Sequence, residues 1–229
     1  MDLFVLGDVD CARVEDLASR IFDVQRNPRT VRPARGEPRS PGAPRRVEER
    51  MDVHQGHLVI GYRTAASFGD PDWPALLFAN GVLGGFTHSK LFQNVRERAS
   101  LAYFVYSNLE QTKGVLWISA GIDFADADRT LDIVGRQLED MRSGHISEEE
   151  MENTRKALLR EIAVMSDDLG SEVDFELLNL VNACRRTPSQ LARDIAAVTR
   201  DDVVRASHGI ALDTVYFLRG DGEGGGARA

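Results

Sequence analysis

The 229-residue sequence has little cysteine, no long apolar run and no excess of basic charge. Its two cysteines, Cys11 and Cys184, lie far apart in unrelated contexts, so we expect neither a disulfide framework nor a zinc knuckle. A net charge of −8 argues against a nucleic-acid-binding protein. No apolar run is long enough to cross a bilayer, and residues 1–5 lack the basic region and cleavage site of a signal peptide. We therefore expect a cytoplasmic protein that does not bind membranes.

The sequence also lacks the common catalytic and phosphate-binding signatures. An inverted zinc motif, H-x-x-E-H, is absent, although its two histidines and glutamate are what metal-assisted hydrolysis needs. His54 and His57 lie three apart at a strand entrance, where they would point to opposite faces, so a polar strand end is favoured over a metal site. Gly84-Gly85 is followed by no Walker-type Lys-Ser/Thr and is more typical of a turn or a close backbone approach. The sequence predicts no metal ligand or cofactor in this chain.

What remains is an ordinary globular composition, with 42 % hydrophobic and 28 % charged residues. Apolar alternation and turn residues predict strands near 48–53, 57–64, 102–110, 115–121 and 214–218. Apolar residues at helical spacing predict helices near 11–22, 72–82, 127–141, 151–167, 171–184, 188–197 and 200–207. This order predicts an α+β fold, with one antiparallel sheet and helices packed on one of its faces.

Composition divides the chain into four parts. Residues 1–24 read as a buried strand at 3–7 and a helix, which together would be the remnant of a preceding half-domain. Residues 25–47 hold many prolines and arginines, and we expect an exposed linker rather than a basic arm for an acidic partner. The α+β domain would span 48–219, and the glycine-rich tail at 220–229 is expected to be disordered. An unpaired strand at 3–7 would also favour a homodimer.

The segment 84–103 carries the most information. Ser89 is a plausible N-cap for a short helix, in which Leu91, Phe92 and Val95 form an apolar stripe. Arg96 would lie at the edge of that stripe. After a break at 99–100 the pattern changes to a strand that includes Tyr103, and a helix-turn-strand can bring the two side chains to one place.

The same segment reads GG-x3-S-x-LF-x2-VRE-x3-LAY, which resembles the C-terminal half of pitrilysin/insulinase-type, mitochondrial-processing-peptidase-like zinc metallopeptidases. QGHLVIGYRT, GVLWISAGID and the stretch from 70 to 107 are similar to bacterial non-peptidase homologues, some of them associated with 5-aminopentanol modification of elongation factor P. The resemblance runs from about residue 3 to about residue 218. It implies a metallopeptidase half-domain of the mitochondrial-processing-peptidase type.

The resemblance gives two residues a role. In active relatives the Arg and Tyr of this motif help to bind substrate and to steady the tetrahedral intermediate, opposite a zinc carried by another half-molecule. By position these roles fall on Arg96 and Tyr103. The residues alone also allow a packing role, with the arginine paired to a nearby carboxylate and the tyrosine packed in the sheet.

Two hypotheses for function follow. In the first, the chain is a non-catalytic subunit that supplies Arg96, Tyr103 and half of a chamber to a homologous zinc-bearing partner acting on peptides. In the second, it is a catalytically dead scaffold or interaction protein, linked to modification of a translation factor. We expect the chain to be inactive as a peptidase on its own, with zinc on the partner.

Overall fold

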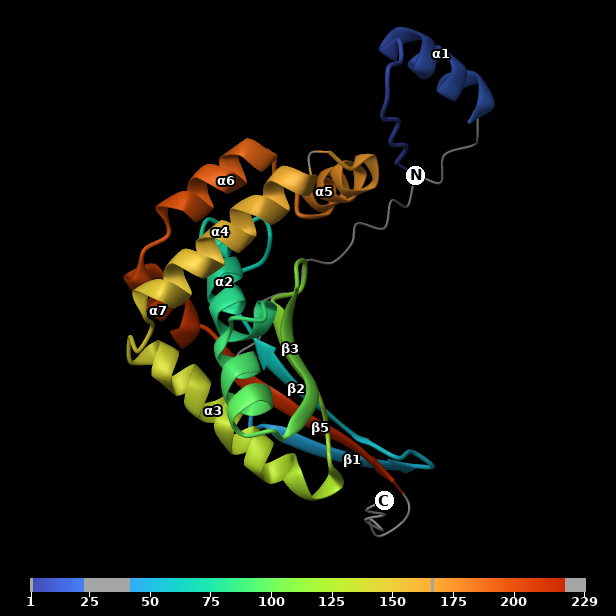
Figure 1. The fold of residues 1–229 in the computed structure, drawn as a ribbon. Coiled ribbons are helices and arrows are strands. Elements are labelled where there is room, and N and C mark those ends of the chain that lie inside the picture. The colour runs from blue at the N-terminus through green and yellow to red at the C-terminus, as the bar shows by residue number, and fades with distance from the viewer. Residues whose placement is uncertain (1, 23–41, 166, 221–229) are drawn as a thin grey trace.

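The computed structural model describes residues 2–22, 42–165 and 167–220 of the protein. Five strands form one sheet in the order β1-β5-β2-β4-β3 (Figure 1). Their bounds are Arg45–Met51 for β1, Gly56–Arg63 for β2, Ala102–Glu110 for β3, Val115–Ile122 for β4 and Ala211–Gly220 for β5. The α+β class and the sheet are confirmed. One detail differs, because β1 pairs with β5 in parallel whereas the other neighbours are antiparallel.

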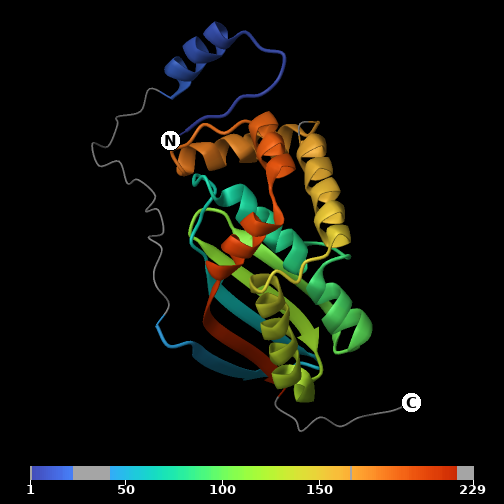
Figure 2. The same ribbon diagram turned by 90° about the vertical axis from the view of Figure 1, so that its left-hand side faces the viewer.

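Helices cover one face of this sheet, as the sequence predicts (Figures 1 and 2). They are α2 (Trp73–Asn80), α3 (Ala127–Arg142), α4 (Glu148–Met165), α5 (Leu169–Val181), α6 (Pro188–Ala197) and α7 (Arg200–His208). Helix α2 is apolar around almost its whole circumference and contacts β3, α4, α6 and α7, so it is the centre of the helical layer. In the described part of the chain, no helix has the length and apolarity to cross a membrane.

The strand pattern explains which face is covered. In β2 the buried residues Leu58, Ile60 and Tyr62 alternate with less buried neighbours, the period expected of a strand with one face in the core. Strand β4 places Leu116 and Ile118 on the same face. Strands β3 and β4 form an antiparallel hairpin, and Gly114 in its turn has a φ of +62°.

The start of α4 is a capping box formed by Ser147 and Glu150. The Glu150 amide donates to Ser147 Oγ at 3.1 Å, and the Ser147 amide donates to Glu150 Oε2 at 2.7 Å. Ile146 and Met151 are both buried beside this box, where a hydrophobic staple would place them. The preceding helix α3 ends before Gly144, whose φ of +78° is typical of the residue after a helix.

Between α2 and β3 the backbone departs from α-helical geometry. Helix α2 continues into the π-helix η1 (Gly81–Gly85), and a second π-helix, η2, spans Phe92–Arg98. A Cβ on Gly84 would lie 2.7 Å from the Oγ of Ser107 and 2.8 Å from its backbone nitrogen. The Ser107 hydroxyl also donates to Asn80 Oδ1 at 2.7 Å. The prediction of a close backbone approach at Gly84-Gly85 is therefore confirmed.

The predicted strand at 3–7 is wrong. Leu3, Phe4 and Leu6 are exposed, and the sheet pairs none of the residues in this segment. An apolar run forms a strand only when a neighbouring strand accepts its backbone hydrogen bonds, and the described chain offers none there. The following helix is confirmed as α1 (Cys11–Ile21), capped by Asp10, but it has no buried residue.

The boundary of the predicted linker also moves. Residues 23–41 lie outside the described residues, as do residues 221–229 of the predicted tail. Residues 45–47, which we expected in the linker, begin β1. Every residue of β1 is exposed, so the strand has no alternation of buried and exposed positions from which the sequence could predict its start. Its backbone pairing with β5 and a hydrogen bond of 2.6 Å from the Tyr216 hydroxyl to Glu49 Oε2 hold it instead.

The packing at Gly84 gives the first testable prediction. Gly84→Ala should lower the free energy of unfolding by about 1–3 kcal/mol, because the new methyl group meets backbone and buried side-chain atoms that have little room to move. Gly135→Ala is the matched control: it lies in the exposed middle of α3 with nothing near its Cβ, and it should stabilise by ~0.5–1 kcal/mol. Urea unfolding of both variants measures the difference, and equal stabilities would contradict the close approach.

Candidate functional site

Arg96 lies on η2 and is more exposed than the sequence predicts. Leu91 and Val95 are fully buried, which confirms the apolar stripe, but the Arg96 side chain is 43 % exposed. Its guanidinium carbon lies 4.8 Å from the centre of the Phe92 ring, and its Nε lies 3.9 Å from Glu97 Oε1. The contact with Glu97 is the carboxylate pairing of the packing alternative, but it is long and involves Nε. The two Nη groups make no hydrogen bond with the described residues, so they can donate to a ligand.

Ser89 does not cap this helix as predicted. Its hydroxyl is buried and has no hydrogen-bond partner, while its carbonyl accepts from the Gln93 amide at 3.0 Å. The adjacent Lys90 anchors the start of the helix instead, with its Nζ 2.9 Å from Glu150 Oε1 on α4. Because the Lys90 side chain is only 9 % exposed, this ion pair is shielded from solvent.

The turn after η2 brings the chain back toward Arg96. Ser100 has a φ of +51°, in the left-handed region that non-glycine residues seldom adopt. The Leu101 amide donates to the Val95 carbonyl at 3.0 Å and closes the turn. The predicted break at 99–100 is confirmed, and the left-handed residue makes it tight enough for β3 to start beside the helix.

Tyr103 is the extra residue of a β-bulge. In the pairing of β3 with β4, Ala102 lies opposite Ile122 and Phe104 opposite Gly121, so Tyr103 has no partner of its own. Its side chain is 78 % exposed. The alternative in which this tyrosine packs in the sheet is therefore wrong. Phe104 takes the packed place, with its ring 2.5 Å from where a Cβ on Gly121 would lie.

Arg96 and Tyr103 line the same open hollow, as the helix-turn-strand reading predicts. The hollow has a volume of about 420 Å³ and is also lined by Gln55, Ser100 and Asp123. A guanidinium can hold a carboxylate or a peptide carbonyl, and a phenol can donate a hydrogen bond to an oxygen that carries developing negative charge. The arrangement is therefore suited to binding and polarising a ligand.

Among the described residues no histidine lines this hollow, and two histidines have hydroxyl partners elsewhere. His57 Nε2 lies 2.6 Å from Ser119 Oγ, and His88 Nε2 lies 3.2 Å from Thr154 Oγ1. Within residues 2–22, 42–165 and 167–220, no group of three or more His, Cys, Asp or Glu side chains could hold a metal ion. The donor set of zinc is not assembled there, so these residues do not fit that metal.

Two features of the hollow escape sequence reasoning. The bulge at Tyr103 and the left-handed conformation of Ser100 are backbone irregularities, and neither residue type predicts them. The one available signal is the adjacent pair of aromatic residues Tyr103-Phe104. Consecutive residues of a regular strand face opposite sides of the sheet, so the two rings cannot pack on the same face. The pairing of β3 with β4 decides which of the two is displaced.

Because Arg96 and Tyr103 are exposed, neither should be needed for folding. Arg96→Gln and Tyr103→Phe are each expected to change the free energy of unfolding by no more than ~0.5 kcal/mol. Leu91→Ala, which truncates a fully buried residue of the same segment, should cost about 3 kcal/mol. Thermal and urea unfolding test this, and a loss above ~1.5 kcal/mol for either exposed variant would restore the packing role.

Comparisons with known proteins bear on the family and the fold of this chain. Residues 1–158 match the family described as "Peptidase M16 inactive domain". The chain is 36 % identical to the "Probable inactive metalloprotease YmfF" of Bacillus subtilis, over 96 % of this chain and 51 % of that protein. Among solved structures, a conserved protein from Enterococcus faecalis superposes with a TM-score of 0.86 at 30 % identity, covering 96 % of this chain and 52 % of the other.

A more distant structure shows the fold alone. The peptidase M16 inactive domain from Pseudomonas fluorescens gives a TM-score of 0.74 at 19 % identity, and the match covers 93 % of this chain and 52 % of that one. In all three matched proteins, this chain spans about half of the relative's length.

Proposed function

Since the chain belongs to the peptidase M16 inactive domain family, we propose that it is the non-catalytic half of a two-part peptidase. In this proposal it supplies Arg96, Tyr103 and one wall of a chamber, and a homologous zinc-bearing half supplies the metal. The chain's own residues bind and orient a peptide. The Arg96 guanidinium holds a carboxylate or carbonyl, and the Tyr103 phenol donates to an oxygen that gains charge during the reaction.

One observation carries the proposal: Arg96 and Tyr103 are brought to one hollow and left exposed by an unusual backbone. A left-handed serine and a bulged tyrosine are conformations that cost free energy, and such features gather at functional sites. Neither side chain is buried in the core in return. A role toward a ligand accounts for this placement better than a role in packing.

The N-terminal residues support a contact with another half-domain. Residues 2–22 expose the apolar side chains of Leu3, Phe4, Leu17 and Ile21, and helix α1 has no buried residue. Exposed apolar surface of this kind is typical of an interface. We propose that residues 1–24 pack with a preceding half-domain, that the inactive half-domain, expected over 48–219, extends from the start of β1 to the end of β5, and that a linker joins the two. Pairing between two copies of the chain through the same residues, to give a homodimer, is the competing arrangement.

The decisive experiment combines this chain with a homologous chain that contains H-x-x-E-H. Peptide hydrolysis and bound zinc should be measured for each chain alone and for the mixture. We expect activity only in the mixture and zinc only on the partner. Zinc and activity in this chain alone would refute the proposal.

Variants then connect the activity to the hollow. In the mixture, Tyr103→Phe should lower kcat about 100-fold, the usual effect of removing one donor to a charged oxygen. Arg96→Gln should lower kcat/KM by a similar factor, while binding to the partner is unchanged. The matched controls are Tyr106→Phe on β3 and Arg129→Gln on α3, which do not line the hollow and should keep full activity.

The alternative is a scaffold or interaction protein without a part in hydrolysis. The family is described as an inactive domain, and a domain without peptidase activity is compatible with a scaffold role. Its suggested link to 5-aminopentanol modification of elongation factor P rests on sequence resemblance. A stable complex with a zinc-bearing partner that shows no turnover, and that is indifferent to Arg96→Gln, would favour this alternative.

A further inference from the structure

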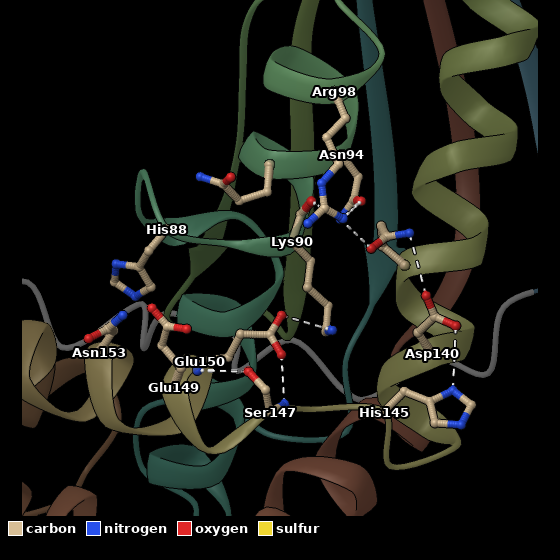
Figure 3. Close-up of a pocket in the computed structure, with 12 residues that line it drawn as sticks. His88, Lys90, Asn94, Arg98, Asp140, His145, Ser147, Glu149, Glu150 and Asn153 are labelled. Atoms are coloured by element: carbon tan, nitrogen blue, oxygen red, sulfur yellow. Dashed lines mark hydrogen bonds and ion pairs between the residues drawn. The ribbon is translucent and has the colours of Figure 1, made fainter.

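A second hollow lies between η2, α3 and the first turns of α4, and neither Arg96 nor Tyr103 lines it (Figure 3). Its volume is about 510 Å³, within the range of about 300–1,000 Å³ that is usual for small-molecule sites. Its lining is mostly polar, with side chains contributed by three separate elements. The proposed function leaves this hollow without a role.

One wall is basic and comes from a single helix. Lys90, Asn94 and Arg98 follow one another at four-residue spacing, and Arg98 Nη1 donates to Asn94 Oδ1 at 3.0 Å. The Lys90 side chain is about nine-tenths buried and has one ion pair, to Glu150, within the described residues. An ammonium has three donors, so this ion pair leaves Lys90 with capacity for a second anionic group.

The facing wall is acidic. The side chain of Glu149 on α4 makes no hydrogen bond or ion pair with the described residues, and neither does the side chain of Asn153, one turn further along. Figure 3 shows Glu149, Asn153 and His88 on the same side of the hollow. On α3, Asp140 Oδ1 lies 3.6 Å from His145 Nδ1. Carboxylate oxygens that lack a partner are ready to accept from an ammonium group.

His88 adds little charge to this arrangement. Burial lowers the pKa of His88 from its ordinary value of 6.5, and the nearby Glu150 acts in the opposite direction. The imidazole is therefore mainly neutral at pH 7. The charges that decide the ligand are those of the two walls.

A ligand of one charge fits this hollow poorly. A simple anion would meet Asp140, Glu149 and Glu150, and a simple cation would meet Lys90 and Arg98. A metal ion is also disfavoured, since the described residues assemble no group of three ligands here. A molecule with a carboxylate at one end and an ammonium at the other meets an opposite charge on each wall.

We propose that this hollow binds a small zwitterion, a peptide of two or three residues with both ends free. Its carboxylate is held by Lys90 and Arg98, and its ammonium by Glu149. The site goes beyond the proposed function and does not depend on it, because it lies entirely on this chain and uses neither residue of the other hollow.

The test is a calorimetric titration of the full chain with trialanine, N-acetyl-trialanine and trialanine amide. Trialanine should bind, and blocking either end should weaken binding at least about fivefold, which corresponds to ~1 kcal/mol for one lost charge contact. Equal binding of the three peptides, or no binding of trialanine at millimolar concentration, would overturn the proposal.

Exposed residues provide variants that keep the fold. Arg98→Gln and Glu149→Gln should each weaken trialanine binding about fivefold, and Arg98→Gln should reduce the difference between trialanine and its amide, because only the Lys90 contact to the carboxylate remains. Glu152→Gln is the matched control, since Glu152 lies on α4 but pairs with Lys156 and does not line the hollow. Unchanged binding in both lining variants would refute the assignment.

Arg96→Gln separates this site from the proposed function. That variant should bind trialanine as well as the original chain does, whatever its effect on hydrolysis in the mixture. A parallel loss of both would show that the two hollows are one site and would overturn the proposal.

Discussion

The close approach of η1 to β3 is the constraint on which the rest of the structure depends. Gly84 has no side chain, so its backbone can lie against Ser107, and the Ser107 hydroxyl links the same strand to Asn80 at the end of α2. Gly81 plays a similar part toward α4, because a Cβ there would lie 2.7 Å from Thr154 Cγ2. The segment that leads to the Arg96 helix is thus wedged between the sheet and the outer helical layer, and larger residues would force these layers apart.

After this close approach, three irregularities of the backbone shape the hollow that Arg96 and Tyr103 line. The π-helical η2 replaces a regular helix, Ser100 reverses the chain in a left-handed conformation, and the bulge turns Tyr103 out of the sheet. The Lys90–Glu150 ion pair fixes the start of this unit to α4, and Glu150 also closes the capping box of that helix. One carboxylate therefore ties the position of the Arg96 helix to the position at which α4 begins.

Sequence reasoning succeeds where a pattern has one physical solution. The alternation in β2 and the S-x-x-E pattern of Ser147 and Glu150 each admit a single local structure, and the structure has both. Sequence reasoning fails where the outcome depends on a distant partner. The apolar run at 3–7 has no strand to join, β1 is held by backbone pairing rather than by buried side chains, and Ser89 is left without an amide to cap. The spacing of the motif predicts that Arg96 and Tyr103 lie close together. The exposure of Tyr103, in contrast, depends on the register of β3 against β4.

The bulge at Tyr103 has an evolutionary consequence. Phe104 packs over Gly121, and Leu91 and Val95 hold η2 in place. The packing of the protein therefore does not depend on which residue occupies position 103 or position 96. Selection for folding therefore acts on the neighbours and leaves these two positions free to drift. Wherever related sequences retain the arginine and the tyrosine together, their retention reports selection on what the hollow binds.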